Sequence, residues 1–194
     1  MWLVVGLGNP GPKYERNRHN VGFRAVDELA RGLPAWKPNK LGGDATTGQL
    51  AATKVVLLRP MEFMNLSGFA VQRTAGFHDV DAAHVIVVHD EIDLDFGIVR
   101  LKSGGGHGGH NGLRSIIDQL GAEFLRVRVG VGRDPNKPPG AQNDAAAWVL
   151  SDFPASQASA VSAVISTACE SVAAILANGI APAMNEHNGR PSVI

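Results

Sequence analysis

The chain has 194 residues, of which 44% are hydrophobic and 19% are charged, and its 18 basic side chains balance its 18 acidic ones. A disordered chain is excluded, because disorder requires few apolar residues and a large net charge. The single cysteine excludes a disulfide framework and a thiolate metal cluster, which indicates a reducing compartment. The length predicts one domain over residues 1–194 with a sizeable core.

The chain starts with a short apolar run at residues 1–5, which lacks the basic residues of a signal peptide and predicts a strand. No apolar run approaches the roughly 18 residues that a membrane helix needs. We therefore expect a soluble, cytoplasmic protein without a membrane partner. The balanced charge gives no overall attraction to a polyanion, so the total alone argues against nucleic acid as a partner.

Short runs of β-branched residues alternate with segments of helical periodicity along the chain, which predicts an α/β fold with a largely parallel or mixed sheet. The strands are expected at residues 3–5, 55–58, 85–88, 98–101 and 127–131. The helices are expected near residues 21–33, 113–120 and 155–177. Residues 34–49 and 134–147 are rich in proline, glycine and asparagine and predict loops or lids.

The first polar segment, G-L-G-N-P-G at residues 6–11, follows the first predicted strand. Its glycine spacing matches the dinucleotide-binding fingerprint, which opens a helix whose N–H groups hold a pyrophosphate. Here the glycines lead into a turn signal that ends at Pro12, and the next helical pattern starts only near Asn20. The acidic residue that ends a second strand in that fold is also missing, which argues against a Rossmann site.

The second segment, residues 14–23, places His19 where a loop meets a helix. Histidine is the commonest general base. An isolated histidine is nevertheless more often a surface or hydrogen-bonded structural residue, so this segment alone favours the structural interpretation.

The third segment, residues 59–68, follows a predicted strand and leads into an apolar helical pattern. Asn65 could therefore be only a helix N-cap. The phenylalanine and two methionines before it could be core residues.

The fourth segment is an apolar strand that runs out into His89, Asp90, Glu91 and Asp93. Open α/β sheets place their sites at this end of a strand. The residues suit metal ligation, or a carboxylate that orients a histidine elsewhere, or a solvated acidic loop. The sequence hardly separates these alternatives.

The fifth segment is the glycine-rich run at residues 102–113, which enters a helix at about Asn111. Glycines let a backbone approach a ligand closely, and the first N–H groups of a helix suit an anion or a carbonyl oxygen. The run also holds His107 and His110, which favours a function over a plain linker.

Together, these segments resemble the bacterial-type peptidyl-tRNA hydrolases through five motifs in the same order: G-L-G-N-P-G, R-H-N-V-G-F, F-M-N-L-S-G, H-D-E-I-D-L and G-G-G-H-G-G-H-N-G-L. The resemblance implies a single α/β domain, a three-layer α/β/α sandwich of the phosphorylase/hydrolase-like kind with a central mixed, mostly parallel twisted sheet. It also implies an enzyme that hydrolyses the ester between a peptide, or an N-acylated amino acid, and the 3′-terminal ribose of tRNA, which frees the tRNA for reuse. A monomer without metal or cofactor is expected from the same resemblance.

The resemblance assigns roles to residues that match the motifs. His19 takes the place of the base that activates water, and Asp90 that of the carboxylate that orients it. The residues that it implies at the substrate are Asn9, Tyr14, Met64, Asn65, His110 and Asn111. The basic residues that it implies at the tRNA acceptor stem and 5′-phosphate are Arg100, Lys102 and Arg133.

The chemistry of these residues agrees with ester hydrolysis. Imidazole, with an unperturbed pKa of about 6.5, can deprotonate water near neutral pH, and a carboxylate on the other ring nitrogen fixes the tautomer. Asparagine amides or loop N–H groups could stabilise the oxyanion. Ser67 lies outside a G-x-S-x-G elbow, so we expect direct attack by water without an acyl-enzyme.

The charges are segregated along the chain although they cancel in total. Residues 1–60 carry nine basic and four acidic groups, 61–96 one and seven, 97–134 six and three, and 135–194 two and four. The basic stretch at 97–134 is a candidate phosphate-contacting face, although Arg126 and Arg128 could equally only solvate a strand.

Three other interpretations compete with this one. A non-catalytic RNA-binding module would lack His19 or Asp90, and both are present. A dinucleotide-dependent oxidoreductase would use residues 6–11 and would show a thermal shift with NAD or NADP. A metal hydrolase would be inhibited by a chelator and would be built on His89, Asp90, Asp93, His107 and His110. The hydrolase without metal fits the five motifs best.

Overall fold

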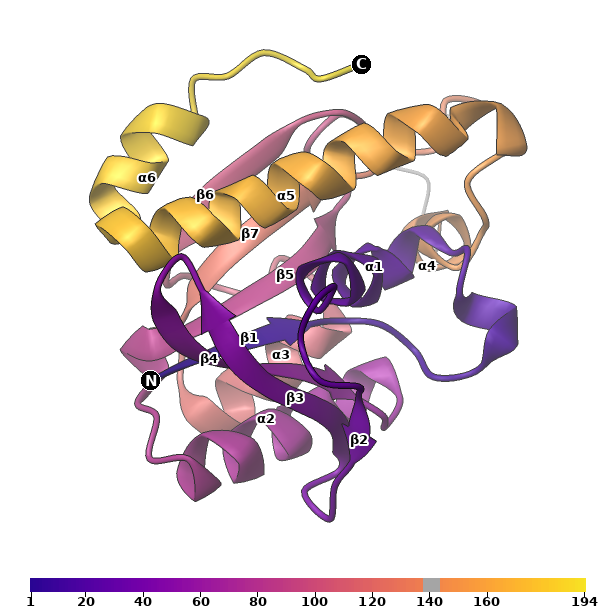
Figure 1. Cartoon of the computed structure of the whole chain (residues 1–194). Coiled ribbons are helices and arrows are strands. Elements are labelled where there is room, and N and C mark those ends of the chain that lie inside the picture. The colour runs from indigo at the N-terminus through magenta and orange to yellow at the C-terminus, as the bar shows by residue number, and fades with distance from the viewer. Residues whose placement is uncertain (138–143) are drawn as a thin grey trace.

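The computed structural model describes residues 1–137 and 144–194, and its strands form one mixed sheet in the order β2-β3-β4-β1-β5-β7-β6 (Figure 1). The four central strands run parallel: β4 (Thr53–Pro60), β1 (Trp2–Gly6), β5 (Val85–Glu91) and β7 (Leu125–Gly130). The flanking strands pair antiparallel: β2 (Lys37–Pro38) and β3 (Gly43–Leu50) at one edge, and β6 (Val99–Ser103) at the other. The predicted α/β class with a mixed sheet is confirmed.

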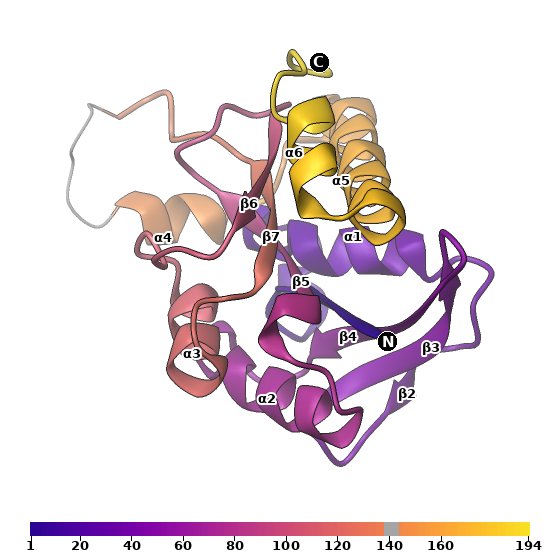
Figure 2. The same cartoon turned by 90° about the vertical axis from the view of Figure 1, so that its left-hand side faces the viewer.

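Helices cover both faces of this sheet (Figure 2). The helices on one face are α1 (Val21–Leu29), α5 (Ala158–Asn178) and α6 (Ile180–His187). The helices on the other face are α2 (Ser67–Phe77) and α3 (Asn111–Leu120). The short helix α4 (Asp144–Val149) follows the segment outside the described residues. The arrangement is the predicted three-layer sandwich.

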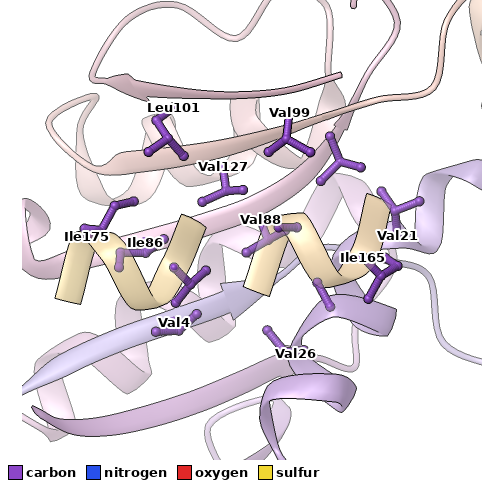
Figure 3. Packing of buried hydrophobic residues seen from close by; sticks show 14 of the residues in the cluster. Val4, Val21, Val26, Ile86, Val88, Val99, Leu101, Val127, Ile165 and Ile175 are labelled. Carbon is purple, nitrogen blue, oxygen red and sulfur yellow. The ribbon is translucent and has the colours of Figure 1, made fainter. Parts of the chain in front are cut away.

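The side chains of the central strands alternate between the two faces of the sheet and so contribute to the hydrophobic core on each face. In β1, Val4 faces the α1 and α5 side while Leu3 and Val5 face the α2 and α3 side. Figure 3 shows Val4, with residues of β5 and β7, packed against the α5 residues Ile165 and Ile175. A strand buried on both faces is apolar at most positions, which explains why the short apolar runs predicted these strands.

Two predicted loops are wrong in part. Residues 34–49 contain β2 and most of β3, which pairs with β4 over its whole length. The sequence G-D-A-T-T-G-Q-L of β3 lacks an apolar run because most of its side chains are partly or fully exposed. Residues 144–147 belong to α4, whereas residues 138–143 of the predicted 134–147 loop lie outside the described residues.

The segment Ala155–Asn178 is long and apolar enough to cross a membrane by length and composition, with a mean hydropathy of 1.8. The expectation that no apolar run approaches that length is therefore wrong. A core helix passes the same test, and the face of α5 that holds Val161, Val164 and Val172 is buried against the sheet. The helix ends at Asn178, and Gly179 after it has a φ of 81°, a conformation that glycine adopts readily.

Candidate active site

A cavity of about 860 Å³ opens at the carboxyl ends of the central strands, where β1 passes into the first polar segment and β5 ends. The predicted site residues that line it are Asn9, His19, Met64, Asn65, Asp90, His110, Asn111 and Arg133. Tyr14, Arg100 and Lys102 are predicted site residues outside its lining. Phe63, Ile92, Val149 and Leu150 add apolar wall. The cavity therefore combines a few polar groups with an apolar wall, as small-molecule sites do.

His19 and Asp90 form the polar centre of the cavity. His19 lies in the 3₁₀ helix η2 (Arg18–Asn20), directly before α1, and its Nδ1 is 2.8 Å and 2.9 Å from the two carboxylate oxygens of Asp90. The Asp90 side chain is 2% exposed and that of His19 12%. Nδ1–H therefore donates to the carboxylate, and Nε2 is left as the basic nitrogen.

Burial and charge act against each other at this pair. Burial lowers the pKa of His19, but the Asp90 carboxylate outweighs it and raises the pKa above its ordinary value. Burial raises the pKa of Asp90, but His19 and His110 outweigh it and hold the pKa of that carboxyl well below its usual range. Asp90 is therefore an ionised carboxylate at neutral pH.

His110 is the second partner of Asp90, with its Nε2 2.9 Å from Oδ1. Its Nδ1 accepts hydrogen bonds from the N–H groups of Gly112 and Leu113, at 3.1 Å and 3.3 Å, so His110 is the N-cap of α3. The sequence predicted the helix start at Asn111 correctly, but nothing in it identified His110 as the cap.

His89 precedes Asp90 in β5 and lies beneath the cavity. Its Nδ1–H donates to the backbone oxygen of Asp90 at 2.8 Å, and its ring packs edge-on against His110 at 5.2 Å. Complete burial lowers the pKa of His89 to about 3, so the ring stays neutral. Its Nε2 is buried without a hydrogen-bond partner among the described residues.

The five-residue metal set does not assemble in the described residues. Asp93 is an exposed partner of Arg133, and His107 turns its Nδ1 to the N–H of Gly109. His19, Asp90 and His110 do present nitrogen and oxygen atoms within 4.8 Å of one another. The hydrogen bonds among these three side chains account for that spacing, and a metal on the Nε2 of His110 would displace a donated proton.

Asn9 is held in one orientation at the cavity wall. Asn20 accepts from its backbone N–H and donates to its backbone oxygen, both at 2.9 Å, and the Asn9 Oδ1 accepts from the N–H of Met64 at 2.9 Å. The amide therefore presents its Nδ2 donor on the remaining side. Asn20 is not among the residues predicted from the sequence, although it lies next to His19 in the second motif.

Close backbone packing fixes η2 on the sheet. A Cβ at Gly22 would lie 2.4 Å from both the Leu7 nitrogen and the Val88 oxygen. Only glycine lets α1 approach β1 and β5 this closely, and this approach carries His19 to the end of β5.

Arg18 is a second residue that the sequence analysis missed. Its guanidinium donates to Ser151 Oγ at 2.7 Å and to the backbone oxygens of Ser151 and Asp152, and it stacks on Trp148 at 3.5 Å. These contacts join η2 to α4 and to the chain directly after it, and residues of α4 line the cavity. No local pattern could predict contacts across more than 130 residues.

The other predicted substrate residues differ in their distance from the cavity: Asn65, Asn111 and Met64 line it, and Tyr14 does not. Asn65 and Asn111 are exposed, and Asn65 makes no capping hydrogen bond, so its interpretation as an N-cap is wrong. Met64 is buried and forms part of the cavity wall, while Tyr14 lies in η1 (Pro12–Tyr14) with the Lys13 ammonium 4.7 Å over its ring.

The three residues predicted to contact phosphates differ in whether their charged groups already contact other parts of the protein. Arg100 donates to the backbone oxygens of Val99 and Arg190, so its head is held on the protein. Lys102 is exposed on β6. Arg133 pairs with Asp93 at 2.5 Å at the cavity rim.

Arg126 has a structural contact. It is buried and donates to the carbonyl oxygens of Gly105 and Gly106, and it supports the glycine-rich loop. Arg128 donates to Glu91 at 3.1 Å and stays partly exposed. The sequence could not separate these two residues, because both alternate with buried valines on β7.

Comparisons with known proteins agree with one another. The family model described as Peptidyl-tRNA hydrolase matches residues 3–193. The chain is 48% identical over 189 residues to the peptidyl-tRNA hydrolase of Frankia alni, covering 96% of this chain and 93% of that protein. It is 48% identical over 186 residues to that of Mycolicibacterium smegmatis, covering 94% and 95% of the two chains.

Solved structures give the same result. A crystal structure of peptidyl-tRNA hydrolase from Acinetobacter baumannii superposes with a TM-score of 0.87 at 38% identity, covering 97% of this chain and 95% of the other. A peptidyl-tRNA hydrolase in complex with N-propanol superposes with a TM-score of 0.89 at 37% identity, covering 100% and 97%.

Proposed function

We propose a mechanism for this chain, which belongs to the peptidyl-tRNA hydrolase family and is an enzyme that hydrolyses peptidyl-tRNA. In this mechanism His19 deprotonates the water that attacks the ester between the peptide and the 3′-terminal ribose. The observation that carries the proposal is the hydrogen-bonded pair of His19 and Asp90 inside a cavity that also holds Asn9.

The positions of the protons on His19 and Asp90 support this role. With Nδ1–H donated to Asp90, Nε2 accepts a proton from water, and the carboxylate stabilises the imidazolium that forms. A positioned base of this kind contributes roughly 10²–10⁴ in rate. The proton can then pass to the ribose oxygen as the ester bond breaks, which returns His19 to its neutral form.

Attack by water rather than by a side chain is the second part of the proposal. Ser67, the serine of the third motif, is completely buried. Cys169 is also a poor nucleophile, because burial raises the pKa of its thiol to about 12. Rapid mixing with substrate followed by denaturation would trap a covalent peptidyl-enzyme if one formed; we expect none, and its detection would exclude this mechanism.

Asparagine amides and Met64 serve as substrate contacts in the proposal. The fixed Nδ2 donor of Asn9 suits the ester carbonyl oxygen or the peptide amide, and Asn65 and Asn111 flank it at the rim. Because these contacts read the backbone, peptide side chains should matter little. N-acylated aminoacyl-tRNA should be cleaved much faster than unblocked aminoacyl-tRNA, and equal rates would exclude a reader of the peptide amide.

The tRNA is proposed to lie with its acceptor stem and 3′ end along the basic stretch around the glycine-rich loop, with Arg100, Lys102 and Arg133 near phosphates. Lys102 is exposed to solvent, whereas the guanidinium of Arg100 donates to a backbone oxygen and that of Arg133 to the Asp93 carboxylate. Replacing Arg100 and Lys102 together by alanine should raise KM and flatten its salt dependence. An unchanged KM at every salt concentration would refute this assignment.

The same proposal treats residues 1–194 as one domain that acts as a cytoplasmic monomer without a metal ion. The direct test is release of peptide from peptidyl-tRNA by the purified protein, with and without a chelator, compared with His19→Ala. We expect full activity with the chelator and almost none from the variant.

A further inference from the structure

Both ring nitrogens of His110 are occupied inside the protein. Nδ1 accepts from two backbone N–H groups at the start of α3, and Nε2 lies 2.9 Å from the Asp90 Oδ1. A nitrogen that accepts two hydrogen bonds carries no proton, so the ring is neutral and its one N–H is on Nε2. His110 therefore donates to Asp90 and has no ring nitrogen left for a substrate.

The Asp90 carboxylate is consequently held from two sides. Its Oδ1 receives the His19 Nδ1–H at 2.8 Å and the His110 Nε2–H at 2.9 Å, and the Asp90 side chain is almost completely buried. The positive end of α3 polarises the His110 ring through the Gly112 and Leu113 N–H groups, which strengthens the bond to Asp90.

Resting on the mechanism proposed above, we propose that His110 is a positioning residue. As a neutral Nε2–H donor it fixes the Asp90 carboxylate in the orientation that accepts from His19, and it withdraws negative charge from that carboxylate. Its hydrogen bonds connect the pair of His19 and Asp90 to the N-terminal end of α3 rather than to the substrate.

The charged and titratable groups around the pair are few. His89 lies beneath it on β5 and is neutral, with its Nδ1–H on the Asp90 backbone oxygen. The other groups that line the cavity are Glu91, His107, Arg114 and Arg133. Among the described residues, none of these side chains makes a hydrogen bond to the Asp90 carboxylate, which leaves His110 as the donor that opposes His19 there.

Two substitutions separate the two contacts of His110. His110→Asn keeps an acceptor near the position of Nδ1, which can cap α3, but it leaves nothing to donate to Asp90. His110→Gln keeps a donor near the position of Nε2 and loses the cap. Each variant is thus the matched control of the other.

His110→Asn should keep the wild-type Tm and KM and lower kcat about tenfold, because Asp90 and His19 lose their fixed orientation. The acid limb of its kcat/KM profile should move to higher pH, because the more negative carboxylate raises the pKa of His19. His110→Gln should keep the wild-type acid limb and lower the Tm. A raised KM with unchanged kcat and acid limb in His110→Asn would make His110 a substrate contact and overturn the proposal.

An equal shift of the acid limb in both variants would also overturn it, because a cationic His110 would give that result. The tautomer itself can be read in the substrate-free wild-type protein by long-range ¹H–¹⁵N correlation of the histidine rings. We expect His110 to show an unprotonated Nδ1 and a protonated Nε2 at neutral pH, as its hydrogen bonds require, and a protonated Nδ1 there would refute the proposal. This measurement needs no activity, so it separates failure of the His110 assignment from failure of the proposed mechanism.

Discussion

Two histidines of this chain lie in networks of similar composition with different surroundings. His19 pairs with Asp90 in the cavity. His187, in α6, has its Nδ1 3.0 Å from Ser171 Oγ and its Nε2 3.8 Å from a Glu186 carboxylate oxygen. A serine, a histidine and a glutamate at these distances have the composition of a hydrolase triad, yet the Ser171 hydroxyl already donates to the Thr167 oxygen at 2.8 Å.

The difference between the networks lies in what each leaves free. His187 is 3% exposed, and its ring nitrogens join α6 to α5 and to an exposed carboxylate. Burial, followed by the nearby Arg190, lowers the pKa of His187, whereas Asp90 raises that of His19. A catalytic histidine needs a basic nitrogen that faces a cavity, and of these two only His19 meets that requirement.

The largest expected effect separates the two histidines directly. His19→Ala should lower kcat/KM for peptidyl-tRNA by roughly 10²–10⁴, because the base is lost. His187→Ala, the matched control, should keep kcat/KM when it is measured well below its lowered Tm. Equal losses of activity in the two folded variants would abolish the distinction.

Asp90→Asn should have the next largest effect, a loss of about 10² in kcat/KM, because the asparagine can hold His19 in the wrong tautomer. The residual activity should show its acid limb at lower pH than the wild type. The sign follows from the cause: without the carboxylate, burial alone acts on His19 and lowers its pKa. If the acid limb of the pH profile did not move in Asp90→Asn, a group other than His19 would be responsible for it.

The elements predicted from the sequence are those whose burial is regular. β1, β4, β5 and β7 are buried on both faces, and α1, α3 and α5 each present one apolar face, so each carries a local pattern. β3 and α4 carry none, since β3 is half exposed and α4 is a short helix whose described surface is mostly exposed. β3 is held by pairing with β4, the next strand along the chain, and α4 is held by the stacking of Arg18 on Trp148, which is distant in the sequence.

The candidate site shows the same limit. The end of β5 indicated a site at Asp90, the resemblance to the family added His19 and Asn9, and the cavity holds all three. The roles of Asn20, Arg18 and Arg126 could not be predicted, because each acts by holding a backbone segment from another part of the chain. Hydrogen bonds of this kind leave no periodic signal.

A smaller effect is expected at the second network, which consists of Ser171, His187 and Glu186. Ser171→Ala should lower the free energy of unfolding by about 1–3 kcal/mol, because His187 loses its buried partner. Ser166→Ala, an exposed serine on the same helix, should change it by less than about 0.5 kcal/mol. Both variants should keep wild-type kcat/KM, and a catalytic loss in Ser171→Ala alone would give the second network a function. Urea unfolding and steady-state assays provide these values.

The smallest effect concerns the pH dependence of stability, in which the two histidines should act in opposite directions. The raised pKa of His19 contributes stability that is present below about pH 6.5 and is lost as the pH rises through the folded-state value. The lowered pKa of His187 contributes stability that is present above about pH 6.5 and is lost as the pH falls through its folded-state value. The destabilisation caused by His19→Gln should therefore grow on acidification from about pH 8 to 6, while that caused by His187→Gln should shrink over the same range. The measurement is the free energy of unfolding in urea as a function of pH for each variant and the wild type. If the destabilisation changed with pH in the same direction for both variants, the two histidines could not have pKa values shifted in opposite directions, because the pH dependence reports the difference in bound protons between the folded and unfolded states.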